Sequence, residues 1–250
     1  FKIFKKAKKI LLDEDNHYET NNDWIKEQGI NLVLQRHYAN VKRFYDNDDQ
    51  GIKCLWHPFS VDANLFCPDN RKRIQKLCLS ASVVQNIYKW REMQLQKLVP
   101  LGLMEDCKEQ RKIGEYYIEN LKAYVGHGSC SSIFDINPAK MWEIMASGSI
   151  LFTDDNPLSG IYRLFDKDTF VCYNRDGSDM VQKAKMIINE PELMKEMAKK
   201  ARNQILQDIL RPTNRLFSIS MATRRRSNNF CLIIKITRIL AFTDILIAGL

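Results

Sequence analysis

Glu143 is the residue whose position first suggests chemistry, because it is a carboxylate within an otherwise apolar helical stretch. The segment NPAKMWEIMASGSILFTDD, residues 137–155, is typical of a short helix that leads into a buried strand. At about 100° per residue, Glu143 points away from the apolar side of that helix, with Lys140 beside it. Four side chains form that apolar side: Met141, Trp142, Ile144 and Met145. Glu143 therefore either belongs to a solvated face or projects into a ligand cleft.

The loop before this helix has a composition that suits a phosphate. GHGSCSSIFDIN, residues 126–137, is rich in small residues that allow a close backbone approach to a ligand. Asn137 is a favourable N-cap, and Pro138 suits the first helical position. Helix N-termini bind phosphates in open α/β sheets, beyond the carboxyl ends of the strands. Ser131 and Ser132 either donate to such a phosphate or cap the following turn.

The strands and helices that must position these residues are predicted to form two successive α/β units. Over residues 9–56, short apolar runs alternate with polar helical stretches in the order strand, helix, strand, helix, strand, which predicts a parallel sheet. Three strands are few for a free-standing domain, and the chain starts at Phe1 rather than Met. We therefore expect residues 1–56 to be the C-terminal part of a larger Rossmann-like domain that is incomplete in this chain.

A connection and a second series follow. Residues 57–72 are rich in Pro, Asn and Asp and lack periodicity, as an interdomain linker would. Residues 73–210 are predicted to form a second Rossmann-like domain. Its expected strands are 74–80, 149–153 and 169–173, and its expected helices are 85–99, 107–125, the helix that carries Glu143, and two between 179 and 210 on either side of Pro191.

Composition limits the class of protein. The 250-residue chain, 45% hydrophobic, can bury a full core, and its seven cysteines include no C-x-x-C pair, which favours a reducing compartment and a cytoplasmic protein. The formal charge of +8 favours anionic partners. The tail, residues 211–250, contains TRRRSNN followed by an apolar stretch interrupted by Lys235, Arg238 and Asp244. Each such charge costs about 2.5–3.5 kcal/mol at mid-bilayer, which disfavours a spanning helix and membrane contact.

Three segments carry a resemblance to a known family. KMWEIMASGSILFTDD resembles the FEAMA-G-P-V-I-T segment of group 1 glycosyltransferases of GT-B fold, most closely the CgeB-like branch, the type of the spore maturation protein. VDANLFCP, residues 61–68, is similar to the family's interdomain GVD-x-x-x-F-x-P segment, and MIINEPELMKEMAKKARNQIL is similar to its final helices. Together they lie in the family's order over residues 57–210, which implies two Rossmann-like domains with parallel sheets.

The resemblance assigns roles to two acids. In this family an E-x7-E pair contacts the donor: the second acid hydrogen-bonds the ribose hydroxyls of a nucleotide sugar, and the first contacts the transferred sugar. Glu143 matches the second acid, and Asp135, eight residues earlier, stands in the place of the first. A carboxylate can accept from two vicinal hydroxyls, which suits a ribose. The shorter side chain of Asp135 has less reach toward the sugar.

Cations are needed to stabilise the diphosphate leaving group. Arg91, in YKWREMQ, matches a Tyr-x-x-Arg-like position of CgeB-type sequences, and Lys140 is a second candidate; each could instead be an ordinary solvated helix cation. TDDN, residues 153–156, resembles a D-x-D metal site, but enzymes of this fold hold the diphosphate with helix dipoles and cations, so Asp154 and Asp155 are interpreted as turn residues and no metal is expected. No histidine has a spacing that indicates a base or a metal ligand.

The resemblance thus predicts a metal-independent glycosyltransferase that uses a nucleoside diphosphate sugar as co-substrate, without another cofactor, and an acceptor of unknown kind, whether glycan, protein or lipid. One alternative is a basic nucleic-acid-binding module, motivated by RKRIQK and TRRR. The scattered basic residues show no aromatic-basic signature, so we do not expect a nucleic-acid partner. The other alternative is a degenerate GT-B scaffold without catalysis, motivated by Asp135.

Overall fold

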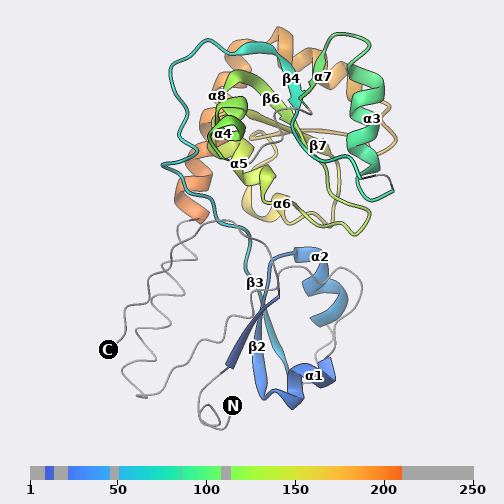
Figure 1. The fold of residues 1–250 in the computed structure, drawn as a ribbon, viewed down its shortest axis with the longest axis vertical. Helices are drawn as coiled ribbons and strands as arrows, with labels where there is room; N and C mark the ends of the chain where they lie inside the picture. The colour runs from blue at the N-terminus through green and yellow to red at the C-terminus, as the bar shows by residue number, and fades with distance from the viewer. Residues whose placement is uncertain (1–8, 14–21, 46–50, 85, 108–113, 210–250) are drawn as a thin grey trace.

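Two parallel sheets organise the computed structural model, which describes residues 9–13, 22–45, 51–84, 86–107 and 114–209 (Figure 1). The first sheet contains β1 (Lys9–Asp13), β2 (Ile30–Gln35) and β3 (Lys53–Trp56) in that order. Its helical segments are α1 (Asn22–Glu27) and α2 (Tyr38–Asn40), which continues into a π-helical turn, Val41–Tyr45. Every strand and helix predicted in this part of the sequence is present, because its apolar periodicity is unambiguous.

The second sheet has five parallel strands in the order β5-β4-β6-β7-β8. The strands are β4 (Ile74–Leu79), β5 (Met104–Asp106), β6 (Tyr124–Gly128), β7 (Ile150–Asp154) and β8 (Val171–Tyr173). The helices are α3 (Lys89–Leu98), α4 (Glu115–Ala123), α5 (Lys140–Ala146), α6 (Ile161–Leu164), α7 (Met180–Asn189) and α8 (Pro191–Gln204), which ends in a π-helical turn, Ile205–Ile209. The predicted α/β class with two parallel sheets is confirmed.

Helices cover both faces of the second sheet. In Figure 1, α3 and α7 lie on one side of the strands and α4, α5 and α8 lie on the other. Two apolar cores match these faces. One core joins α5 to α4, α8 and the linker, and includes Trp142, Met145 and Ile205. The other packs the sheet against α3, α7 and the start of α8, and includes Leu77, Phe152 and Tyr173.

The sequence analysis missed β5 and β6. It assigned YVGHG, residues 124–128, partly to a helix and partly to a loop, because glycines disfavour strands. In the structure these glycines are required by packing: a Cβ on Gly126 would lie 2.8 Å from Leu77 Cδ2, and one on Gly128 would lie 2.2 Å from Gln94 Oε1. The helix predicted over 85–99 begins only at Lys89, after Asn86 with φ of 68°.

Residues 57–73 contain neither helix nor strand and connect the two sheets. Arg202 of α8 ties this connection to the second sheet's helices. Its guanidinium donates to the carbonyls of Ala63 and Phe66, each at 3.2 Å, and to that of Ala146 at the end of α5. The domain boundaries given above remain predictions, and the tail after residue 210 lies outside the described residues.

Other contacts join the two sheets directly. Arg43, in the π-helical turn after α2, donates from Nη1 to Phe134 O at 2.7 Å. Arg163 of α6 lies over the ring of Tyr38, with 4.1 Å from its Cζ to the ring centroid. Gly160 lies against Trp56, since an added Cβ would be 2.5 Å from Trp56 Cζ2. The carboxyl-end loops of the second sheet therefore face the first sheet.

Candidate functional site

The candidate site lies where the strand order of the second sheet reverses. From β4 the chain goes first to β5 on one side and then, through α4, to β6 on the other side. The loops after β4 and β6 diverge at this switch point, where ligands of open α/β sheets bind. Ser80 Oγ and Ser129 Oγ, in the first positions after these two strands, are buried and make no hydrogen bond within the described structure. These two orphaned hydroxyls mark a place where a ligand could supply partners.

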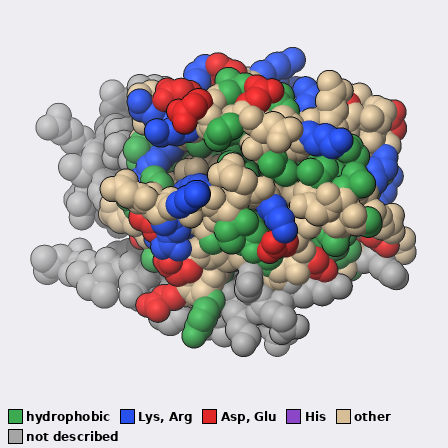
Figure 2. Space-filling view, turned by 90° about the horizontal axis from the view of Figure 1, so that it is seen from above, with side chains coloured by type: hydrophobic (Ala, Val, Ile, Leu, Met, Phe, Trp, Pro, Cys, Tyr) green, Lys and Arg blue, Asp and Glu red, His purple; other side chains and the backbone are tan. Residues whose placement is uncertain are grey.

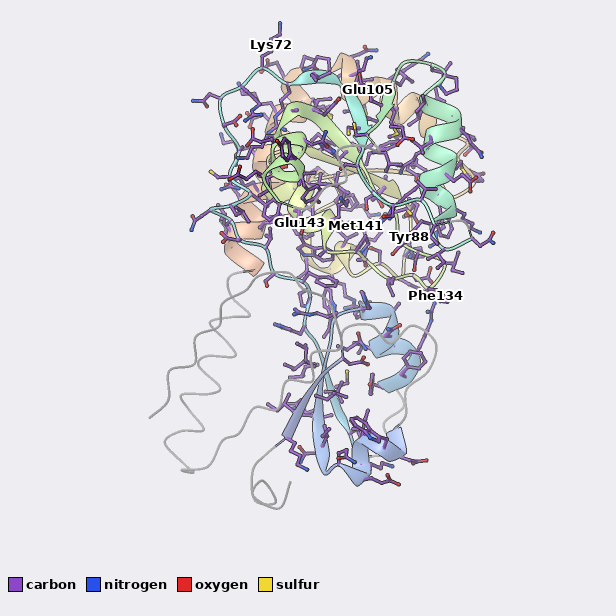
Figure 3. The ribbon with its side chains drawn as sticks, viewed as in Figure 1. Lys72, Tyr88, Glu105, Phe134, Met141 and Glu143 are labelled. Carbon is purple, nitrogen blue, oxygen red and sulfur yellow. The ribbon has the colours of Figure 1, made fainter. Side chains whose placement is uncertain are left out.

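Glu143 is half-buried on α5 and is not part of a freely solvated face. Its Oε2 accepts a hydrogen bond of 2.6 Å from the hydroxyl of Tyr117 on α4. Figure 3 labels Glu143 and Tyr88 on the side of the second sheet and its helices that is nearer to the first sheet. The projection of Glu143 into a ligand cleft, the other interpretation drawn from periodicity, stays a prediction.

Lys140 lies beside this pair. Its Nζ donates to Ser80 O at 3.1 Å and lies 4.0 Å from the centroid of the Tyr117 ring. We call Tyr117, Lys140 and Glu143 the α5 cluster. It connects the start of α5 to the first residue after β4, so a cation and a carboxylate lie together at the switch point.

Arg91 on α3 reaches the same loop from the other face of the sheet. Only 4% of the residue is exposed; Nη1 donates to Ser82 O at 2.8 Å, and Nε has no partner in the described structure. The guanidinium also stacks on the Tyr88 ring, 3.8 Å from its centroid. An ordinary solvated helix cation would not be buried in this way. Arg91 and Lys140 therefore both hold the loop 80–82, and Arg91 retains an unused donor.

Asp135 belongs to a different set of contacts, which we call the arginine network. Its Oδ2 lies 2.5 Å from Arg43 Nη2, and its Oδ1 lies 2.8 Å from Arg175 Nη2. Asn156 Nδ2 also donates to Oδ1, at 3.1 Å. Asp135 has φ of 59°, a left-handed conformation that Asp tolerates better than most residues. The side chain that stands in the place of the family's first acid is thus engaged by two arginines.

Asp154 completes the arginine network and differs from the turn residue that the sequence suggested. Its side chain is fully buried at the end of β7, where Oδ2 lies 3.0 Å from Arg175 Nε. It also accepts from Ser131, at 2.7 Å from the backbone N–H and 2.5 Å from the hydroxyl. The Ser131 hydroxyl is therefore committed to Asp154. Ser132 Oγ accepts from Phe134 N at 3.1 Å, which is the turn-capping alternative.

The prediction that Asn137 caps the helix is wrong. The helix begins at Lys140, and no side chain caps it. Asn137 instead donates from Nδ2 to Ser159 Oγ at 2.7 Å and accepts at Oδ1 from Gly160 N at 3.0 Å. The amide gains more from bridging two buried loops than from a cap, because a buried backbone N–H needs a partner.

Two other side chains in this region, Cys130 and His127, are buried. Burial raises the pKa of the Cys130 thiol to about 12, so it stays protonated and is a poor nucleophile. His127, placed by the sequence in a loop, lies in β6 with 1% of its surface exposed. Among the described residues, no three His, Cys, Asp or Glu side chains are arranged to hold a metal ion.

Sequence reasoning missed Tyr117, Arg43 and Arg175. Each comes from an element distant in sequence from its partner, so no local spacing could indicate it. Arg175 follows β8 closely, and its place beyond the carboxyl end of a predicted strand is the one signal that could have identified it.

The face opposite the first sheet has a mixed surface. On the side drawn in Figure 2, Lys and Arg side chains are interspersed with Asp, Glu and apolar groups and form no continuous basic patch. Within the described residues, no helix combines the length and apolar character needed to cross a bilayer. The tail on which the membrane question rests lies outside those residues.

Part of the chain matches a known protein family. Residues 118–211, which include α5 and both acids, match the family model described as glycosyl transferase-like. No curated protein sequence matches the chain. The match supports a glycosyltransferase, as the sequence predicted.

Solved structures share the fold. A TarM variant from S. aureus, in complex with fondaparinux, alpha-GlcNAc-glycerol and UDP, is 18% identical over 85% of this chain and 51% of its own, with a TM-score of 0.62. HepE from Anabaena, in complex with UDP and glucose, is 10% identical over 85% of this chain and 71% of its own, with a TM-score of 0.60. A glycosyltransferase from Rickettsia africae is 12% identical over 86% and 71%, with a TM-score of 0.59. The expected GT-B-like fold is confirmed, and the chain spans about half the length of TarM.

Proposed function

We propose that this protein is a glycosyltransferase that takes a sugar from a nucleoside diphosphate sugar bound at the switch point of the second sheet. One observation carries the proposal: Arg91 and Lys140, from helices on opposite faces of the sheet, converge on the loop after β4 beside the carboxylate of Glu143. Two cations next to a diol-accepting carboxylate suit a diphosphate joined to a ribose. UDP in the complexes of TarM and HepE supports UDP sugars as the first donors to test.

Each group has a role in this proposal. Glu143 accepts hydrogen bonds from the ribose hydroxyls. Arg91 and Lys140 neutralise the charge that develops on the diphosphate as the bond to the sugar breaks. Because α5 has only seven residues, we assign the diphosphate to these cations rather than to a helix dipole. Neither a metal ion nor a further cofactor is part of the proposal, and the acceptor is left open.

Asp135 is proposed to contact the transferred sugar. In the arginine network both of its oxygens already have partners, so a sugar hydroxyl must share an oxygen or displace Arg43. Ser131, Ser132 and Asn137 then act by holding the shape of the loop, since their polar groups bond within the protein.

The family branch and the location are also proposals. The resemblance of α5 and the linker supports a CgeB-like enzyme. Six free cysteines in the described part of the chain, with no disulfide among them, support a cytoplasmic location.

Nucleotide binding tests the proposal directly. In calorimetric titrations, we expect the 250-residue chain to bind UDP or GDP, Glu143→Ala to weaken that binding about tenfold or more, and Arg91→Met to weaken it similarly. Lys89→Met is the matched control for Arg91, because Lys89 is exposed on the same helix and lies over Trp90. Unaltered affinity in both site variants, or no response to any nucleoside diphosphate, would refute the assignment.

A second candidate is a GT-B scaffold that binds nucleotide without transferring sugar. The engagement of Asp135 by two arginines favours it. A panel of UDP and GDP sugars, monitored for release of the nucleoside diphosphate, separates the two candidates. Binding with release supports the transferase, whereas binding without release from any donor supports the scaffold. Strongly salt-dependent binding of unrelated oligonucleotides would instead indicate the nucleic-acid alternative.

A further inference from the structure

Tyr117 makes the only described hydrogen bond to the Glu143 carboxylate. The phenol donates to Oε2 at 2.6 Å, and Oε1 accepts no hydrogen bond from the part of the chain that the structure describes. The two oxygens of one carboxylate therefore have different surroundings. One is held by the protein, and the other keeps its full accepting capacity.

The phenol itself is fixed by its neighbours. Its ring packs edge-on against Phe66 of the interdomain connection, with 6.4 Å between ring centroids. Lys140 Nζ lies over the ring, 4.0 Å from the centroid. The ring also lies against the apolar core that contains α5. A side chain held by packing on the ring and by a cation can impose a direction on its hydroxyl, as a positioning residue must.

The Tyr117 hydroxyl is held in its protonated, donating form. Burial, and then the charge of Glu143, raise the pKa of Tyr117 well above its usual value. The bond to Oε2 is therefore a neutral donor to a charged acceptor, a class of hydrogen bond that is stronger than one between neutral groups.

We propose that Tyr117 is a positioning residue for nucleotide recognition: it holds Oε2 of Glu143 so that Oε1 is presented to the ribose hydroxyls of the donor. This inference rests on the proposed function and deepens it. Tyr117 does not need to touch the nucleotide. Its contribution is to remove the rotational freedom of the Glu143 side chain before the ligand arrives, so that binding does not have to order it.

Binding of UDP to the 250-residue chain tests this role. We expect Tyr117→Phe to weaken UDP binding about tenfold, because the carboxylate loses one charged hydrogen bond and its fixed orientation. Tyr116→Phe is the matched control: it removes the same atom from the neighbouring residue, which is 75% exposed. Thermal unfolding of each variant confirms that the protein is folded before affinities are compared.

A double-mutant cycle separates positioning from a structural effect. In a Glu143→Ala background, Tyr117→Phe should cause no further loss of affinity, since no carboxylate remains to be oriented. A purely structural role of Tyr117 would instead give losses that multiply. The folded wild-type chain should also prefer UDP to 2′-deoxy-UDP, and Tyr117→Phe should reduce that preference.

The outcomes distinguish this inference from the proposed function. If Glu143→Ala weakens UDP binding but Tyr117→Phe does not, the inference is overturned and the proposed function stands. The inference is also overturned if the losses of UDP affinity in Tyr117→Phe and Glu143→Ala multiply in the double variant. It is likewise overturned if Tyr117→Phe prefers UDP to 2′-deoxy-UDP as strongly as the wild-type chain does. If Glu143→Ala leaves affinity unchanged, the inference fails, and the proposed function fails with it if Arg91→Met also leaves affinity unchanged. The inference is supported if Tyr117→Phe weakens UDP binding in the wild-type background but not in the Glu143→Ala background, and if Tyr116→Phe does not weaken it.

Discussion

Arg43 and Asp135 join the two halves of the molecule through an ion pair of 2.5 Å between Nη2 and Oδ2. Arg43 follows α2 beside the first sheet, and Asp135 lies in the loop after β6 of the second. The residue that the sequence suggested for sugar contact is thus also an interdomain contact. Any rearrangement that separates the two sheets must break this pair.

We expect Arg43→Met to loosen the two halves with little effect on overall stability. The Arg43 side chain is 35% exposed, and partly exposed ion pairs contribute only about 0.5 kcal/mol after solvent screening. Limited proteolysis should therefore cut within residues 57–73 faster in Arg43→Met, while the unfolding midpoint changes little. Lys53→Met, an exposed cation on β3, is the control. Equal cleavage rates in wild type and both variants would show that the other contacts hold the halves together.

Arg73 stabilises the end of α5, and its loss should be costly. Its guanidinium donates to Ser147 O at 2.7 Å, to Tyr124 O at 3.0 Å and to Ser149 Oγ at 2.5 Å. Arg73→Met removes the side-chain donor from all three acceptors, the buried carbonyl of Ser147 among them, so we expect the free energy of unfolding to fall by about 2–4 kcal/mol.

Arg71, two residues earlier, is the control for Arg73. It pairs with Asp69 and Glu119 at the surface, so Arg71→Met should change the free energy of unfolding by no more than about 0.5 kcal/mol. Chemical denaturation of both variants measures the difference. Similar losses in the two variants would mean that the buried carbonyls find water or other donors when Arg73 is absent.

His127 makes stability depend on pH. Burial, together with the positive charges of Lys140 and Arg73, lowers its pKa from 6.5 to about 3. Below the unfolded pKa the unfolded chain takes up a proton that the folded chain does not, so stability is full above about pH 6.5 and falls as the pH decreases toward 3. By linkage, the loss at pH 5 is about 2 kcal/mol.

Urea unfolding at pH 7.5 and pH 5.0 tests this expectation. His127→Gln cannot titrate, so its pH dependence should be smaller than that of the wild-type chain by about 2 kcal/mol. The reading would be wrong if both proteins lost the same free energy on acidification, because the proton uptake would then belong to other groups.

The sequence predicted elements where one physical signal dominates. Apolar runs defined β1 to β4, β7 and β8, and Pro191 marked the boundary between α7 and α8. It failed at β6, where Gly126 and Gly128 are selected by their neighbours on β4, β7 and α3 rather than by strand propensity. Tertiary packing decides which residue fits at such positions, and a single sequence does not show which residues will be neighbours in space.

The candidate site shows the same division. The helix period placed Glu143 and Lys140 away from the buried side of α5, as the structure has them, and the resemblance pointed to Arg91, whose role stays a prediction. Asn137 was misassigned because a cap is a local interaction, whereas its real partners, Ser159 and Gly160, lie beyond β7. Tyr117, Arg43 and Arg175 were missed because long-range partners of a carboxylate leave no trace in its own segment.

Arg202 gives the last described helix a role in more than the packing of its own sheet. Because its guanidinium joins the carbonyls of Ala63 and Phe66 to that of Ala146, a residue near one end of the described chain secures both the interdomain connection and the end of the helix that carries Glu143. Truncation before residue 202 would therefore remove this clamp as well as the core contacts of Ile205. A segment that looks dispensable from its distance to the site would then be required for both the angle between the two halves and the placement of the carboxylate.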